Sequence, residues 1–144
     1  MKTFKAVLVL FLVSIVANAQ DLTIAEVPSN IKTQFNKEFK NARDIEWEND
    51  FDKFKVEFEV DRMDYEVWYS TDAKQVKLEK EISKLDLPTA VSKAIQAKFS
   101  EYHIDDCELQ EVNNTVTYFV ELEKWNYEID VVYSAKGKLI RTTH

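Results

Sequence analysis

Apolar and polar residues follow two different spacings along this chain. Near Pro28 a large apolar residue recurs at every fourth position, at Ile31, Phe35 and Phe39. This spacing predicts a helix that begins close to the proline and buries one stripe. Apolar and polar residues then alternate at 45–48, 54–60, 65–69 and around 76–78, with turn residues between the stretches. Such alternation is typical of antiparallel hairpins with one face exposed to solvent, so we predict one helix followed by four strands.

The same pattern returns about sixty residues later. The helical residues match Val91, Ile95 and Phe99 at an offset of 60. Strand residues match at larger offsets, Val56 with Val120 at 64 and Tyr65 with Tyr127 at 62. On the offset of 62, Cys107 corresponds to the inward-facing Ile45 and is a small buried hydrophobe. We therefore predict a first repeat at 20–84 and a second at 85–144, joined in one globular domain.

Together the repeats predict an α+β fold. Each contributes one helix and four strands, which gives one antiparallel sheet of about eight strands with both helices packed on one face. Gly137, the only glycine in the chain, falls where the last hairpin must turn. The second face of the sheet is left open.

The first nineteen residues differ from the two repeats in their pattern and predict a targeting segment. Two lysines precede an apolar run at 6–16, and Ala17-Asn18-Ala19 has the small residues of a cleavage site. This is the pattern of a signal peptide at 1–19, cleaved near Ala19. The run is shorter than the ~20 residues that span a bilayer, so we expect a periplasmic or secreted protein without a stable membrane anchor.

Charge narrows the class of partner. The chain has 19 basic and 26 acidic residues, and without the two leader lysines the net charge is 17 − 26 = −9. Such a charge repels nucleic acid and anionic membrane surfaces. The single cysteine leaves no internal disulfide, so packing alone holds the fold.

The chain has a proline-initiated helix and acid-rich strands, and this layout is duplicated behind a leader. It resembles the periplasmic PepSY-like, beta-lactamase-inhibitor-protein-like family. The resemblance covers nearly all of residues 20–144 and lies in repeat layout and alternation. It implies a tandem helix-plus-sheet fold, and protein binding or inhibition of exported enzymes as its role. It supplies no catalytic residue and no inhibitory contact for particular positions of this chain.

Strand parity selects the candidate binding residues. If the alternate apolar residues face the helices, a mixed aromatic and acidic set faces solvent: Trp68, Phe119, Trp125, Glu57, Glu66, Glu121 and Asp130. Aromatic anchors within a polar surface are typical of protein-binding hot spots. Two alternatives remain: Trp68 and Phe119 stack on each other across strands, and Trp125 lies in a turn where parity does not hold.

Other clusters give weaker signals. Asp105, Asp106 and Glu108, like Asp50 and Asp52, lack the spacing and central glycine of a calcium loop, so no metal site is expected. His103 and Cys107 have no third group to orient them, and no phosphate loop or other cofactor motif occurs. We expect a non-catalytic module that binds another exported protein, possible inhibition included. The alternative is an envelope protein that binds a cation or small ligand on its acidic strands.

Overall fold

The structure is a computed structural model and describes residues 20–143. Within this range the chain forms two helices, a short 3-10 turn and nine strands. The first half contains β1 (Gln20–Leu22), α1 (Ser29–Glu38), β2 (Arg43–Asp50), β3 (Lys53–Val60), β4 (Met63–Ser70) and β5 (Gln75–Glu81). The second half contains η1 (Lys84–Asp86), α2 (Thr89–Lys98), β6 (His103–Val112), β7 (Thr115–Lys124), β8 (Tyr127–Ser134) and β9 (Leu139–Thr143).

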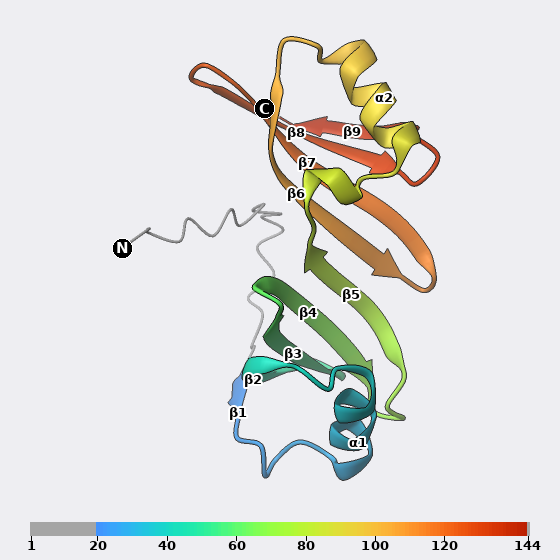
Figure 1. Cartoon of the computed structure of the whole chain (residues 1–144). Coiled ribbons are helices and arrows are strands. Elements are labelled where there is room, and N and C mark those ends of the chain that lie inside the picture. Colours follow the sequence, from blue (N-terminus) through green and yellow to red (C-terminus); the bar gives the residue numbers. More distant parts are fainter. Residues whose placement is uncertain (1–19, 144) are drawn as a thin grey trace.

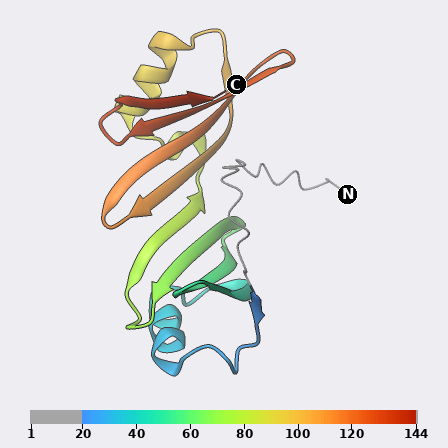
Figure 2. The same cartoon turned by 180° about the vertical axis from the view of Figure 1, so that it is seen from behind.

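The strands form one antiparallel sheet in sequence order from β1 to β9. This confirms the predicted α+β fold (Figures 1 and 2). The sheet has one strand beyond the predicted eight, because β1 pairs with β2 at the edge. Its three residues are too few to show an alternating pattern.

Each helix covers its own half of the sheet, and the two halves have separate hydrophobic cores. In the first, Ile31 and Phe35 of α1 pack against a set on β2 to β4: Trp47, Val56, Phe58, Val67 and Tyr69. In the second, Val91 and Ile95 of α2 pack against a set on β6 to β8: Cys107, Val120, Leu122, Val131 and Tyr133. β5 joins the halves because it pairs with both β4 and β6.

The strand register gives the true correspondence between the repeats. Val56 pairs with Trp47, and its counterpart Val120 pairs with Cys107. Cys107 is therefore the counterpart of Trp47 at an offset of 60, and the predicted match with Ile45 is wrong. β6 and β7 have ten residues each where β2 and β3 have eight. This longer hairpin raises the offset from 60 on its first strand to 64 on its second, and only its two turn residues correspond at 62.

A bulge near the start of β2 accounts for the exposure of Ile45. The register shifts between Arg43 and Glu46, and Asp44 has a φ of 50°. The extra residue breaks the alternation, so Ile45 is 42% exposed and does not face the helix as predicted. β6 has the equivalent bulge between Ile104 and Asp106.

Candidate functional site: the open face of the sheet

The face of the sheet opposite the helices is hollowed over both repeats. The hollow has a volume of about 1470 Å³ and draws its walls from β2 to β9. Thirteen described carboxylates line it: Asp44, Glu46, Glu57, Glu59, Asp64, Glu66, Glu79, Glu81, Asp105, Asp106, Glu108, Glu121 and Glu128. The cations among the described lining residues are Lys55, Lys77, Lys80 and Arg141. The surface is therefore strongly acidic.

Many of these carboxylates stand directly opposite one another on neighbouring strands. A first carboxylate row crosses β2 to β5 and consists of Glu46, Glu57, Glu66 and Glu79. A second carboxylate row crosses β6 to β8 and consists of Asp106, Glu121 and Asp130. Like charges at directly opposed positions destabilise a sheet. The fold thus keeps two rows of repulsive pairs on the one face that no helix covers.

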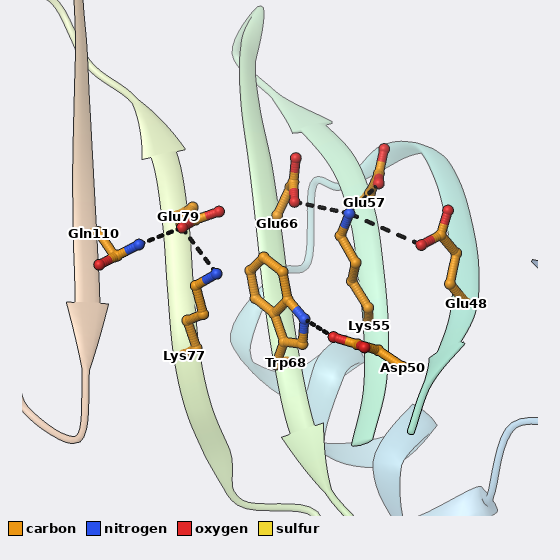
Figure 3. Close-up of polar contacts among 9 residues, drawn as sticks. All are labelled: Glu48, Asp50, Lys55, Glu57, Glu66, Trp68, Lys77, Glu79 and Gln110. Atoms are coloured by element: carbon orange, nitrogen blue, oxygen red, sulfur yellow. Dashed lines mark hydrogen bonds and ion pairs between the residues drawn. The ribbon is translucent and has the colours of Figure 1, made fainter. Parts of the chain in front are cut away.

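In the first repeat, lysines neutralise much of this charge. The Nζ atom of Lys55 lies 2.9 Å from a carboxylate oxygen of Glu66 and also pairs with Glu57 (Figure 3). Burial opposes the charged form of Lys55, but its hydrogen bonds to the two glutamates outweigh this and raise its pKa. Lys77 lies 2.9 Å from Glu79, which also accepts a hydrogen bond from Gln110.

Trp68 lies on the open face as predicted, but it is not exposed. Its side chain is 7% exposed because Lys77 and Lys55 lie over the ring, with Nζ atoms 3.8 Å and 5.3 Å from the ring centroid. The indole Nε1 donates a hydrogen bond to Asp50 at 2.8 Å (Figure 3). Stacking of Trp68 on Phe119 is wrong too, because β5 and β6 separate the strands that carry them.

In the second repeat, apolar residues occupy the two central positions of the corresponding row. Glu48, Lys55, Trp68 and Lys77 lie opposite one another across β2 to β5. Their counterparts across β6 to β9 are Glu108, Phe119, Val132 and Arg141. Ile140, which sequence reasoning missed, also lines the hollow and is 55% exposed. Its contribution was hidden because the bulge in the β8–β9 pairing shifts the parity of β9.

Trp125 lies apart from the hollow. It occupies the turn between β7 and β8, has a φ of 58° and is 81% exposed. Tyr127 follows it and is 69% exposed. Figure 1 shows this hairpin projecting beyond the body of the second half. The alternative that Trp125 is a turn residue is therefore correct, and its side chain contacts Lys124 on its own hairpin.

Glu108 is the carboxylate most affected by the hollow. Burial, with Asp106 and Glu79 nearby, raises the pKa of Glu108 to about 7. Burial also raises the pKa values of Glu48, Glu81 and Glu121. The surroundings of all four groups therefore oppose their charged form.

Raising the pH from 5 to 8 is expected to lower the free energy of unfolding. The folded-state pKa of Glu108 exceeds its unfolded value, so the folded protein binds this proton more tightly, and the stability it adds is lost as the pH rises through 7. After discounting for solvent screening we expect a loss of about 1–2 kcal/mol. Urea denaturation at several pH values measures it. In Glu108→Gln the free energy of unfolding should depend less on pH. An unchanged pH dependence in that variant would contradict the assignment of the effect to Glu108.

The remaining candidate groups do not assemble into a reactive site. Cys107 is 2% exposed in the second core, and burial, followed by the charge of Asp106, raises the pKa of its thiol to about 12. His103 is exposed at the start of β6. Among residues 20–143 no three histidine, cysteine or acidic side chains are placed to hold a metal ion.

These features define a two-repeat α+β protein with an open, acidic, concave sheet face. The family model described as "Putative beta-lactamase-inhibitor-like, PepSY-like" matches residues 13–73 and 52–141. The chain belongs to this PepSY-like, beta-lactamase-inhibitor-like family. Among curated proteins, none matches the sequence.

Solved structures share the fold. A BLIP-like protein from Bacteroides fragilis is 24% identical, with a TM-score of 0.66 over 81% of this chain and 84% of that chain. A DUF2874 family protein from Bacteroides uniformis is 19% identical, with a TM-score of 0.68 over 81% and 88%. A protein from Bacteroides eggerthii, described as periplasmic, is 20% identical, with a TM-score of 0.69 over 81% and 88%. At these identities the likeness concerns the fold alone.

Proposed function

We propose that this protein is a non-catalytic, exported module that binds a basic protein partner on the open face of its sheet. The carrying observation is the pair of carboxylate rows, in which like charges stand directly opposite one another inside a hollow of about 1470 Å³. A cationic partner relieves this repulsion when it binds. Charge of opposite sign also speeds the encounter between two proteins.

Of the candidate residues, Glu57, Glu66, Glu121 and Phe119 line this hollow, and Asp130 continues the second carboxylate row. Trp68 supports the surface from beneath its lysines. Trp125 projects on its hairpin, so it contacts only a partner that extends past the hollow.

Two observations support export. Residues 1–19, which lie outside the described residues, have the sequence pattern of a signal peptide. A solved structure of the same fold comes from a protein described as periplasmic. As a separate finding, residues 20–143 contain no helix that is long and apolar enough to cross a membrane. A partner met after export fits the family description, and the same contact inhibits that partner wherever it covers an active site.

Neutralising the second carboxylate row is expected to weaken partner capture. The double variant Glu121→Gln, Asp130→Asn removes two opposed carboxylates from the open face, and we expect at least about tenfold less captured protein from an envelope extract. Quantitative mass spectrometry of the captured proteins measures the loss, and the activity of any captured enzyme tests inhibition.

The matched control is Asp61→Asn, Asp86→Asn. It makes the same change in net charge at exposed residues that do not line the hollow. If both double variants lost partner capture equally, the effect would depend on net charge alone. This result would contradict binding on the open face. If millimolar Ca²⁺ raises the melting temperature and the carboxylate variant abolishes the rise, the alternative of a cation-binding protein is favoured instead.

A further inference from the structure

The two repeats present different chemistry at the same structural positions. Phe119 takes the place of Lys55, Val132 that of Trp68, and Ile140 that of Val76. The second repeat thus carries an apolar strip, which we define as Phe119, Val132 and Ile140. Val132 is 5% exposed and forms the floor of the strip, whereas Phe119 is partly exposed and Ile140 is 55% exposed. Carboxylates border the strip at one end, where Glu108 pairs across strands with Phe119, and along one side, where Glu121 pairs with Asp130. Arg141 pairs with Val132 at the other end.

The equivalent surface of the first repeat is already occupied by its own side chains. Lys55 pairs with Glu57 and Glu66, and Lys77 pairs with Glu79. Both lysines also cover the ring of Trp68 (Figure 3). A partner that used this half would first have to break these contacts. The first repeat is therefore a poor place for a new salt bridge or apolar contact.

In the second repeat Arg141 takes the place of Lys77, but an apolar residue, Phe119, takes the place of Lys55 next to the carboxylate row. Within residues 20–143 no ion pair involves Glu108, Glu121 or Asp130. Burial, followed by the charge of Glu128, raises the pKa of Glu121. Ile140, which is 55% exposed, lines the same hollow. Uncompensated carboxylates thus border exposed apolar surface at one end of the hollow.

From this contrast we infer that the apolar strip of the second repeat is the specific recognition surface, and that it accepts a partner segment with a large apolar side chain between lysines or arginines. This inference rests on the proposed function and narrows it to one half of the face. Charge complementarity carries the choice of partner, because the cations meet the bordering carboxylates while the apolar side chain covers the strip.

Two synthetic peptides test this partner chemistry directly. One has a leucine between two pairs of lysines, and the other has a glycine in place of the leucine. We expect the leucine peptide to bind about tenfold more tightly, because it alone buries a large apolar side chain. Chemical shift changes in the isotope-labelled protein should centre on Phe119, Val132 and Ile140.

Variants then locate the surface. Phe119→Lys gives the second repeat the residue of the first and should abolish the preference for leucine. Ile140→Ser, at an exposed position that leaves the core intact, should reduce it. Ile24→Lys is the matched control, since Ile24 is 60% exposed but lies away from the hollow, and it should retain the preference.

Four results would overturn the inference. Equal binding of the two peptides would contradict recognition by the apolar strip but would be consistent with binding on the acidic face. If neither peptide bound, the proposed function would be contradicted as well. Shift changes centred on Lys55 would assign recognition to the first repeat. If the NMR signals of the strip residues broadened with protein concentration in the absence of peptide, the strip would bind a second copy of the chain instead.

Discussion

Replacing Gly137 with alanine should lower the free energy of unfolding by about 2–5 kcal/mol. Gly137 lies in the β8–β9 turn with a φ of 77°, where an L-residue costs ~1–2 kcal/mol. An added Cβ would also lie 2.4 Å from the carbonyl oxygen of Ala90 in the first turn of α2, and such overlap costs about 1–3 kcal/mol more. Urea denaturation followed by circular dichroism measures the change.

The first repeat supplies the control for this substitution. Ala73 occupies the equivalent turn, with the same backbone hydrogen bond to a serine three residues earlier, and has a φ of 61°. An alanine is already present there, so Ala73→Gly should change stability by less than about 1 kcal/mol. A Gly137→Ala variant as stable as the parent would mean that α2 shifts freely over the sheet, contrary to the packing described above.

Replacing Trp68 with alanine is expected to cost about 2–4 kcal/mol. Trp68 is 7% exposed, so its truncation removes a large buried apolar surface. The substitution removes the donor to Asp50 and both lysine contacts with the ring. Thermal and chemical denaturation, compared with the parent, give the loss.

Phe119→Ala provides the comparison for Trp68. Phe119 is only half-buried and borders the hollow, so its removal should cost about 1–2 kcal/mol, clearly less than the loss of Trp68. A smaller loss for Trp68→Ala than for Phe119→Ala would show that the lysines do not seal the first repeat. It would also remove the contrast between the repeats from which the recognition surface was inferred.

The fold was predictable from sequence because its signals are local. Fourfold spacing at Ile31 and Phe35 and alternation through Val56 and Phe58 reveal the helix and strand faces without knowledge of distant partners. The error at Cys107 came from a hairpin lengthened by two residues on each strand, which no turn residue marks. The bulge at Asp44 was missed because a positive φ at an aspartate has no sequence signature.

The candidate site was predictable only as a face. Parity placed Glu57, Glu66 and Phe119 on the open side, since that depends on alternation within one strand. Exposure depends on neighbours from other strands, and so Trp68 was misjudged: the lysine that lies closest to its ring comes from β5. The offset of 64 found for Val56 and Val120 also aligns Lys55 with Phe119, but the effect of this difference depends on the neighbouring strands, which only the register of both repeats gives.

The strictly sequential order of the strands has a consequence for how the chain acquires its structure. Every described strand pairs only with the strands directly before and after it. A chain that emerges N-terminus first, from a ribosome or a translocation pore, therefore always finds its next partner in what has already emerged. The first core is complete by β5, whose outer edge then serves as a template for β6. No long-range loop must close, which favours rapid folding and shortens the time that unpaired strands are open to aggregation.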